Sequence, residues 1–403
     1  MVFPLKTLIT ILDEVNRKMR ILVTRFEPFP FGSATAFRAS LLCQMLKELG
    51  HEVTVLTPNS NEKKEKNGES QGCNAIRIIS PQKFGCKSYD DMFNNYVACN
   101  KVDLIFRSTS IKHFSKVTRY AENNHIPIVY DSVEWYGPSN WRLGRLDPRY
   151  WLFQYLWRYK FIKGNGIIAI SRLIESHFNK YIDNTVRIPT ITDCSTELYN
   201  ETERIKSDNI YFIFSGKLDN GKDRVIDFVK AMDKIGKDGE KIQLDIYGPS
   251  LEDIKLQFGG NFKLIKKMQK QIRIHGLVSQ SEARKHCAES DFCIFFRPNR
   301  RSSNAGFPTK LGECMTLGTP AFCNDTGDIS LVVKDEINGI LIRDCSVDVI
   351  EKKLRAILNM SDKEMRMMRY KAREAALVFF DYHNYLDRLN KVVINASNSL
   401  KQL

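Results

Sequence analysis

Residues 209–222 read NIYFIFSGKLDNGK, an apolar run that ends in a glycine and two lysines. The apolar part is only a few residues long and does not alternate between apolar and polar side chains. Such a run is typical of a strand buried on both faces, as in a parallel sheet covered by helices. A helical pattern follows it, so this stretch predicts the strand–turn–helix unit of doubly wound α/β domains.

Similar apolar runs recur along the whole chain with helical patterns between them. In the first half they occupy 20–25, 52–57, 75–79, 102–107, 126–131, 166–171 and 186–189. In the second half they occupy 209–215, 243–247, 272–275, 292–297, 320–323 and 339–343. Two sets of this size exceed a comfortable single sheet, so we predict two doubly wound parallel sheets. The chain ends in helical patterns at 346–358, 361–377 and 381–397.

The domain organisation follows from the position of polar stretches between these sets. A chain of 403 residues suggests two or three domains, at about 150 residues each. The polar stretch 194–208 is the best linker. We therefore predict an N-terminal extension, two Rossmann-like domains and a C-terminal helix that packs back on the first domain. These four segments are 1–18, 19–200, 201–380 and 381–403.

Two further stretches are predicted to lie outside the domains. Residues 1–18 lack a small-residue cleavage site, so a secretory signal is disfavoured. An amphipathic helix and an upstream start codon both remain open for them, since Met19 opens the first strand. The charged stretch 60–72 predicts a solvated loop.

Composition and charge exclude several classes of protein. The chain is 43% apolar with 24 Phe and 15 Tyr, which excludes global disorder. No stretch approaches the length of apolar residues that an ordinary membrane-spanning helix needs. The net charge of +14 favours an anionic partner, although no nucleic-acid-binding module is visible. The ten cysteines form no C-x-x-C pair, which favours reduced thiols in a cytosolic protein over a zinc site.

The loops after two strands carry residues suited to phosphate. Gly32 and Ser33 follow the first strand and open a helix, whose N-terminus favours an anion. Gly216, Lys217 and Lys222 follow the strand at 209–215, and they suit a diphosphate. An ordinary strand–helix turn and solvated lysines are the alternatives. The absence of G-x-G-x-x-G removes the main support for a nicotinamide cofactor.

A third loop combines a turn with a single carboxylate. The turn Phe307, Pro308, Thr309 and Lys310 opens a helix, and its amides are predicted to face a phosphate. Glu313 lies one turn inside this helix, where a carboxylate can accept hydrogen bonds from two sugar hydroxyls. A solvated helix residue is the alternative for Glu313.

The stretch from Met19 to about Tyr385 resembles bacterial family 4 glycosyltransferases of the GT-B fold, of the polysaccharide-assembly type. The carrying motifs in the first half are RILVTRFEPFPFG (20–32), GHEVTVLTP (50–58) and IAIS (168–171). Those in the second half are FSGKLDNGK (214–222), LDIYG (244–248), IRIHGLVSQSE (272–282), FPTKLGECMTLGTPAFCNDTGD (307–328) and NGILI (338–342). The resemblance implies two Rossmann-like domains that face a cleft, with the C-terminal helix crossing back to the first.

The resemblance also assigns roles in the second half, which would bind a nucleotide-sugar donor. Lys217 and Lys222 would hold its diphosphate, and Glu313 would bind its ribose. Gly248 and Gly276 would shape the nucleobase pocket. The resemblance implies that no cofactor and no metal ion are needed, because the lysines and a helix N-terminus stabilise the leaving diphosphate.

The chain departs from the family at Lys217, where relatives usually carry an arginine, and at Ala305, and it leaves two acceptor candidates. The first carboxylate of the family's E-x7-E motif falls at Ala305, so that carboxylate is absent. In the first half, which would bind the acceptor, Asp131 and Glu134 are the available carboxylates after a strand. Either could orient the acceptor hydroxyl or take its proton, and a structural role is the alternative for each.

The resemblance implies a retaining, metal-independent hexosyl transfer to a glycan or lipid-linked acceptor in cell-surface polysaccharide assembly. A nucleotide-sugar epimerase on the same fold, or a non-enzymatic carbohydrate- or anion-binding protein, are the alternatives. The expected location is cytoplasmic, with possible peripheral attachment to the inner face of the membrane. Residues 141–163 mix aromatic and basic side chains, which suits an anionic lipid surface or, alternatively, a core-facing helix with snorkelling cations.

Overall fold

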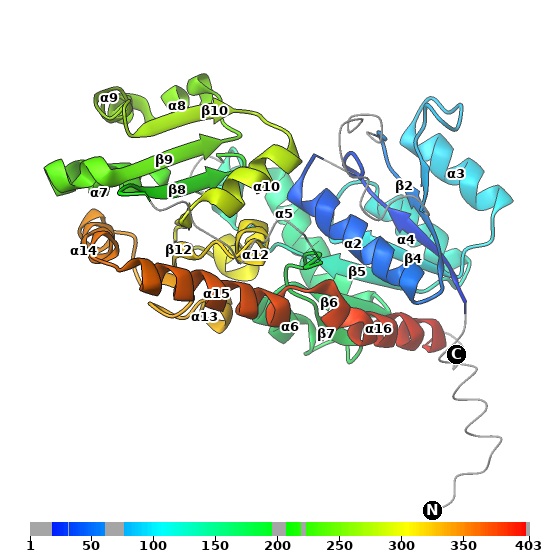
Figure 1. The fold of residues 1–403 in the computed structure, drawn as a ribbon. Coiled ribbons are helices and arrows are strands. Elements are labelled where there is room, and N and C mark those ends of the chain that lie inside the picture. Colours follow the sequence, from blue (N-terminus) through cyan, green and yellow to red (C-terminus); the bar gives the residue numbers. More distant parts are fainter. Residues whose placement is uncertain (1–17, 31, 61–75, 196–206, 219–222, 400–403) are drawn as a thin grey trace, which may run out of the picture. The chain divides into compact units, whose positions relative to one another are not determined.

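The computed structural model describes residues 18–30, 32–60, 76–195, 207–218 and 223–399. The predicted linker at 194–208, the extension at 1–18 and the loop at 60–72 therefore lie largely outside the described residues. Lys222 also lies outside them. The chain divides into two compact units, and the first takes up both ends of the chain (Figure 1). Unit 1 is Met1–Pro189 with Tyr382–Leu403, and unit 2 is Thr190–Asp381.

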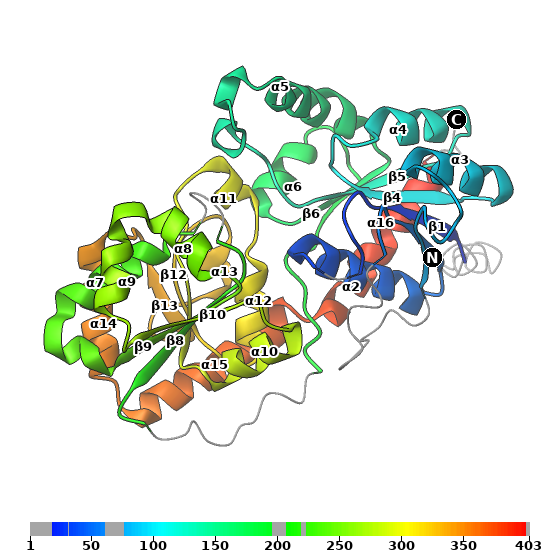
Figure 2. The same ribbon diagram turned by 90° about the horizontal axis from the view of Figure 1, so that it is seen from above.

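Unit 1 is built on a parallel sheet of seven strands in the order β3-β2-β1-β4-β5-β6-β7. The strands are β1 (Arg20–Thr24), β2 (Glu52–Leu56), β3 (Arg77–Ile79), β4 (Leu104–Ser108), β5 (Ile128–Ser132), β6 (Gly166–Ala169) and β7 (Thr185–Arg187). The α-helices are α2 (Ala34–Glu48), α3 (Tyr89–Cys99), α4 (Phe114–Asn123), α5 (Pro148–Tyr155), α6 (Arg172–Phe178) and α16 (Leu386–Asn398). Helices α2 and α16 lie on one face of the sheet, and α3 and α4 lie on the other (Figure 2).

Unit 2 is built on a parallel sheet of six strands in the order β10-β9-β8-β11-β12-β13. The strands are β8 (Ile210–Ser215), β9 (Ile242–Tyr247), β10 (Ile272–Gly276), β11 (Phe292–Phe295), β12 (Ala321–Asn324) and β13 (Gly339–Ile342). The α-helices are α7 (Val225–Ile235), α8 (Leu251–Phe258), α9 (Phe262–Lys267), α10 (Gln280–Glu289), α11 (Arg301–Ala305), α12 (Thr309–Thr316), α13 (Ile329–Val332), α14 (Val347–Leu358) and α15 (Asp362–Phe379). Helices α7, α9 and α14 cover one face, and α10, α12 and α15 cover the other (Figure 2).

The prediction of two doubly wound parallel sheets is confirmed, because each unit is built on one such sheet. Every predicted strand is present, with bounds within two residues of the prediction. The strand interiors are almost fully buried, as β5 and β6 show along their whole length. This burial on both faces is the reason that the strands read as continuous apolar runs rather than alternating ones.

The C-terminal helix packs on unit 1, as the fold prediction required. The amide Nδ2 of Asn184 donates to the carbonyl of Val392 in α16 at 2.9 Å. Gln44 Nε2 in α2 donates to the hydroxyl of Tyr382 at 2.9 Å. The helix begins later than the predicted residue 381, because Tyr382–Tyr385 form a 3₁₀ turn.

The strand order of each sheet reverses beside its first strand, because later strands are added on the opposite side of it. Such a switch point forms a ligand crevice at the carboxyl edge of a parallel sheet. In unit 1 the reversal lies between β1 and β4, and in unit 2 it lies between β8 and β11. Loops that follow these strands at the carboxyl edge are therefore the places to look for function. They include the Gly32 loop and the Gly216 loop that the sequence singled out.

Candidate functional site

Three glycines meet at the carboxyl edge of the unit 2 sheet. Gly216, Gly248 and Gly276 lie at the ends of neighbouring strands and have φ values of +128°, +107° and +69°. The Gly216 amide donates to the carbonyl of Tyr247 at 3.0 Å, and the Gly248 amide donates to the carbonyl of Gly276 at 2.7 Å. These left-handed positions suit glycine, and they turn the chain without side chains above the sheet. The structure therefore brings together three glycines that the sequence predicted separately.

The closest approach among these glycines gives a testable prediction. A Cβ atom on Gly248 would lie 2.5 Å from the carbonyl oxygen of Gly216. We expect Gly248→Ala to lower the free energy of unfolding by at least about 1–3 kcal/mol, because the positive φ adds strain to this clash. Hydrogen exchange of β8 and β9 measures the loss. Gly260→Ala is the control, since a Cβ there meets nothing within 4 Å, and equal losses in both variants would contradict the prediction.

A half-buried lysine lies beneath the Gly216 loop. The side chain of Lys310 is 16% exposed, and its Nζ lies 3.6 Å from Oδ1 of Asp223. The same Nζ lies 3.8 Å from the ring centroid of Phe214, a cation–π contact. A Cβ on Gly216 would lie 2.6 Å from Lys310 Cε. Burial lowers the pKa of Lys310, and the carboxylate of Asp223 opposes that shift.

Further positive charge gathers at the same reversal point of the sheet. Lys217 follows Gly216 and is exposed. Arg297 follows β11, and its charge contributes to the lowered pKa of Lys310. The Arg297 backbone is fixed by Asn324, whose Oδ1 accepts its amide at 2.7 Å and whose Nδ2 donates to its carbonyl at 2.8 Å. The sequence analysis missed Arg297 because it counted residue 297 in the strand, whereas β11 ends at Phe295.

Helix α12 presents its N-terminal turn and Glu313 next to these cations. Pro308 precedes the helix without a side-chain cap, and the Phe307 carbonyl accepts a hydrogen bond from Thr190 Oγ1 at 3.2 Å. Burial raises the pKa of Glu313, whereas the charges of Arg284 and Lys310 lower it. Within the described ranges, no hydrogen bond or ion pair is recorded for this carboxylate.

The place of the missing carboxylate lies in helix α11. Ala305 is fully buried there, with no exposed surface. Its methyl group therefore presents nothing to a ligand. Thr309 and Lys310, the next predicted residues, open α12 and are half-buried.

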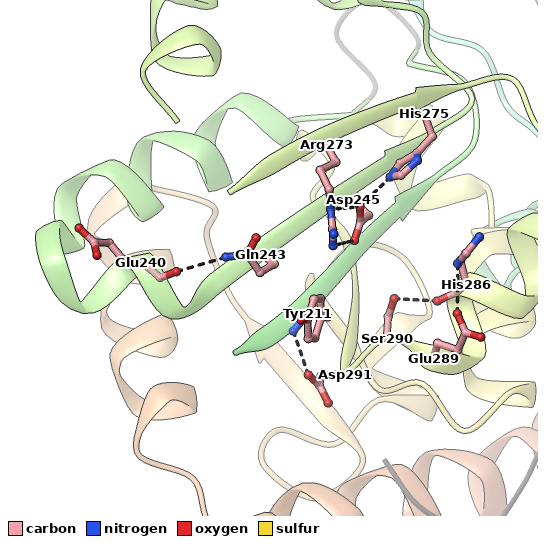
Figure 3. Close-up of polar contacts among 10 residues, drawn as sticks. All are labelled: Tyr211, Glu240, Gln243, Asp245, Arg273, His275, His286, Glu289, Ser290 and Asp291. Atoms are coloured by element: carbon pink, nitrogen blue, oxygen red, sulfur yellow. Dashed lines mark hydrogen bonds and ion pairs between the residues drawn. The ribbon is translucent and has the colours of Figure 1, made fainter. Parts of the chain in front are cut away.

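A polar cluster that the sequence analysis missed ties β9 to β10 beside the glycines (Figure 3). Asp245 accepts hydrogen bonds from Arg273 Nε at 2.8 Å, and its Oδ1 lies 2.6 Å from His275 Nε2. The Tyr247 ring stacks on His275 at 4.2 Å and on His286 of α10 at 5.0 Å. Burial raises the pKa of Tyr247 to about 12. The sequence signal for this cluster was the alternation of polar and apolar residues in D-I-Y (245–247) and R-I-H (273–275), which lie on the neighbouring strands β9 and β10.

In unit 1, the two predicted acceptor carboxylates have different surroundings. Asp131 is 6% exposed, and its Oδ1 accepts from Nη2 of Arg38 at 2.9 Å. Arg38 also donates to the carbonyls of Ile188 and Pro189 at the end of the unit. Glu134 is half-buried. Asp131 therefore has a structural partner in Arg38.

Both carboxylates line a cavity of about 150 Å³ at the reversal point between β1 and β4. Ser33 of the predicted Gly32–Ser33 loop caps α2 by accepting from the Ala36 amide at 3.1 Å, and its Oγ lies 3.0 Å from Oγ1 of Thr35. Thr35 in the same turn lines the cavity. The structure thus places the predicted loop and the predicted carboxylates near one cavity of unit 1.

Residues 141–163 form helix α5, a π-helical turn at Leu156–Lys160 and the flanking turns. The inner side chains of this segment are buried, as predicted for a core-facing helix. The outer side chains are exposed and mix aromatic with basic residues, as predicted for a surface that meets anionic lipid. The exposed apolar side chains are Leu143, Leu146, Trp151, Leu152, Tyr155 and Tyr159. The exposed cations are Arg142, Arg145, Arg149, Arg158 and Lys163. We call this set the α5 surface.

Two classes of site are not found in the part of the chain that the structure describes. No group of three or more His, Cys, Asp or Glu side chains there is placed to hold a metal ion. No helix there has the length and apolar content to cross a membrane.

Comparison with known proteins supports glycosyl transfer. Residues 195–375 match the family model described as glycosyl transferases group 1. This match covers the greater part of unit 2, including the glycines, Lys310 and Glu313. No curated protein matches the sequence significantly.

Several solved structures share the fold over nearly the whole chain. HepE from Anabaena, in complex with UDP and glucose, matches with a TM-score of 0.69 and 14% identity, covering 96% of this chain and 100% of that one. Sucrose-phosphate synthase from Thermosynechococcus elongatus matches with a TM-score of 0.68 and 14% identity, covering 93% and 98%. WaaG, a glycosyltransferase involved in lipopolysaccharide biosynthesis, matches with a TM-score of 0.63 and 15% identity, covering 88% and 95%.

Proposed function

We propose that this protein is a retaining glycosyltransferase of family 4, which moves a hexose from a nucleotide sugar to a glycan or lipid-linked acceptor. The observation that carries the proposal is the carboxyl edge of unit 2. There, a side-chain-free glycine edge, a half-buried lysine and a helix start without a side-chain cap lie together in the segment that matches group 1 glycosyl transferases.

The donor is proposed to bind along this edge. Lys217 and Lys222 neutralise the diphosphate from the Gly216 loop, and the first amides of α12 add hydrogen bonds. Glu313 accepts hydrogen bonds from the ribose hydroxyls. Gly248 and Gly276 leave room for the base. Structures of HepE with UDP and with UDP-glucose make a uridine nucleotide the first donor to test.

The chemistry proposed for the site is electrostatic. As the bond between the sugar and the diphosphate breaks, negative charge grows on the leaving group, and fixed positive charges stabilise it. The lysines and the α12 amides supply that charge, so the proposal requires no metal ion. The acceptor hydroxyl attacks the face that the diphosphate leaves, and Glu134 orients this hydroxyl or takes its proton.

The α5 surface supports a location at an anionic membrane and a role in cell-surface polysaccharide assembly. It displays six large apolar side chains, which would sit at the headgroup boundary, and five cations. The only acidic residue in the segment, Asp147, is buried and lies 2.7 Å from Arg149. Residues 141–163 therefore have no exposed carboxylate that would repel an anionic lipid.

Charge reversal on the α5 surface tests the membrane proposal. We expect the double variant Arg145→Glu and Arg158→Glu to bind vesicles containing phosphatidylglycerol at least about tenfold more weakly, since each cation contributes about 1 kcal/mol. Sedimentation measures the bound fraction. Arg119→Glu with Lys87→Glu is the control, because it makes the same charge change at exposed positions elsewhere in unit 1. Equal weakening in both double variants would show a net-charge effect and contradict a defined surface.

A thermal-shift screen tests the donor. A nucleotide sugar present at 100 times its Kd stabilises the native protein by about 2.7 kcal/mol, which corresponds to a rise in Tm of roughly 5–10 °C. We expect one nucleotide class to give this shift. Incubation of that donor with acceptor should release the nucleoside diphosphate. A new nucleotide sugar formed from the donor alone would instead indicate an epimerase, and no shift with any donor would overturn the proposal.

A further inference from the structure

Three charged side chains at the reversal point of the unit 2 sheet have a buried polar atom without a hydrogen-bond partner among the described residues. The atoms are Lys310 Nζ, Asp223 Oδ1 and Arg297 Nε. They come from different elements, because Lys310 lies in α12, Asp223 precedes α7 and Arg297 follows β11. Buried polar groups of native proteins are almost always hydrogen-bonded. Three exceptions around one lysine therefore point to a ligand that completes these contacts.

The ion pair between Lys310 and Asp223 does not satisfy the two atoms that form it. Lys310 Nζ lies 3.6 Å from Asp223 Oδ1, which is too far for a hydrogen bond. By contrast, Lys353 of the same unit lies 2.7 Å from Asp335 and 2.7 Å from Glu336. A buried pair that served stability alone would close to such a distance, because it needs direct hydrogen bonds to offset its desolvation.

Lys310 lies directly against the loop that is proposed to carry the diphosphate. A Cβ atom on Gly216 would meet Lys310 Cε at 2.6 Å and Nζ at 3.2 Å, so the absence of a side chain at Gly216 leaves the space for the ammonium. The Lys310 side chain is 16% exposed, and its long unbranched stem lets the ammonium turn. Rotation of its terminal bonds can therefore bring Nζ toward the exposed Lys217, which follows Gly216.

The surroundings of Lys310 favour an anion. Burial is the main cause that lowers the pKa of Lys310, Asp223 opposes this shift, and the charge of Arg297 adds to it. A diphosphate beside the Gly216 loop would stabilise the ammonium more than one distant carboxylate does, since it offers several charged oxygens. Lys310 also belongs to the first turn of α12, which has no acidic residue and no side-chain cap, so the helix dipole favours negative charge at the same place.

We propose that Lys310 exchanges partners when the donor binds, so that its ammonium leaves the long ion pair with Asp223 and donates to the diphosphate of the donor. This inference rests on the proposed function for the identity of the donor, and it adds one donor-binding residue and a proton-linked control to that site. Before the donor binds, the carboxylate of Asp223 favours the charged form of Lys310. Asp223 is therefore a positioning residue that acts through Lys310.

The exchange predicts that diphosphate binding weakens as the pH rises. In the free protein the ammonium of Lys310 is fully present below its lowered pKa, and it is lost as the pH rises through that pKa. A bound diphosphate raises the pKa of Lys310, so binding at higher pH must take up a proton. The affinity therefore falls with rising pH in a window that lies below the ordinary lysine pKa of about 10.4.

Calorimetric titration of the full-length protein with inorganic pyrophosphate tests the exchange, because this probe carries a diphosphate without base or sugar. Lys310→Met should weaken binding at neutral pH at least about tenfold, as expected for loss of a charge-assisted contact. The double variant Lys310→Met with Asp223→Asn removes both charges, so it avoids an unpaired buried carboxylate and should bind as weakly. Lys270→Met is the control, because it removes an exposed lysine elsewhere in unit 2, and it should bind as the unchanged protein does.

A pH series between about 7 and 10 separates a donor-binding role from a structural one. Lys310→Arg should retain binding and lose the fall of affinity with pH, since a guanidinium stays charged throughout. Asp223→Asn should move the fall to lower pH, because the carboxylate no longer opposes the lowered pKa of Lys310. The other titratable groups that face Lys310 are the same in both variants, so the comparison isolates Lys310; they are Arg297, Glu313 and Cys314.

Several results would overturn the exchange. They are the absence of pyrophosphate binding by the unchanged protein, equal affinities in Lys310→Met and Lys270→Met, and a fall with pH in Lys310→Arg as steep as in the unchanged protein.

Failure of the proposed function gives a different result. Glu313→Gln should bind pyrophosphate at least as tightly as the unchanged protein, because the probe has no ribose, while it loses nucleotide-sugar binding. Pyrophosphate binding that depends on Lys310, without a thermal shift by any nucleotide sugar, would overturn the proposed donor and support the exchange. A nucleotide-sugar shift that is equally large in Lys310→Met would overturn the exchange and leave the proposed donor intact.

Discussion

Replacing Glu313 with glutamine should lower kcat/KM for sugar transfer at least about tenfold. The substitution keeps the size of the side chain but removes the negative charge. A hydrogen bond to a charged group is worth about 1.5–3 kcal/mol, and about 1.4 kcal/mol corresponds to a factor of ten. The carboxylate is half-buried with no recorded partner in the described part of unit 2, so its contact with ribose hydroxyls has little competition.

The measurement is steady-state kinetics with the donor identified by thermal shift. Glu252→Gln is the matched control, because Glu252 also lies in the first part of a helix of unit 2 and is exposed. It should change kcat/KM little. An unchanged kcat/KM in Glu313→Gln would contradict the assignment of the donor site to the carboxyl edge of unit 2. The thermal shift with donor should fall in parallel, since the contact exists in the bound ground state.

Replacing Asp131 with alanine should lower the free energy of unfolding of unit 1 by about 3–5 kcal/mol. The substitution leaves the Arg38 guanidinium buried without its counter-charge. It also releases the arginine that holds the carbonyls of Ile188 and Pro189 at the end of the unit. A large loss of stability would identify the role of Asp131 as structural, which leaves Glu134 as the acceptor carboxylate.

Tryptophan fluorescence during urea unfolding measures this loss, because all four tryptophans lie in unit 1. Asp103→Ala is the control. Asp103 also pairs with an arginine through two side-chain hydrogen bonds and accepts that residue's backbone amide as well, but Arg20 is 45% exposed at that pair. We expect a loss below about 1 kcal/mol there. The double variant Arg38→Met with Asp131→Leu should recover most of the stability, since it removes both charges. Similar losses in Asp131→Ala and Asp103→Ala would contradict the structural role.

The sequence by itself determined the architecture and the loops that matter. Strands buried on both faces read as apolar runs, and glycines that need a positive φ stand directly after them. Both signals are local, so they are legible without knowledge of the fold. Gly216 and Lys217 were singled out in this way, as the loop after a predicted strand, whereas Gly248 and Gly276 were assigned through the family resemblance.

Only the tertiary structure decided which charges are paired and which are buried. Arg38 and Asp131 are 93 residues apart in the chain, and nothing local marks them as partners. Lys310 lies under Gly216 because two strand–helix units pack side by side. Arg25 and Lys112 meet at one cavity because β1 and β4 are neighbours in the sheet. Whether a charge acts on a ligand depends on its burial and its counter-charge. Burial and counter-charge are both set by contacts between residues distant in sequence. The fold could therefore be predicted from the sequence, whereas the electrostatics of the sites could not.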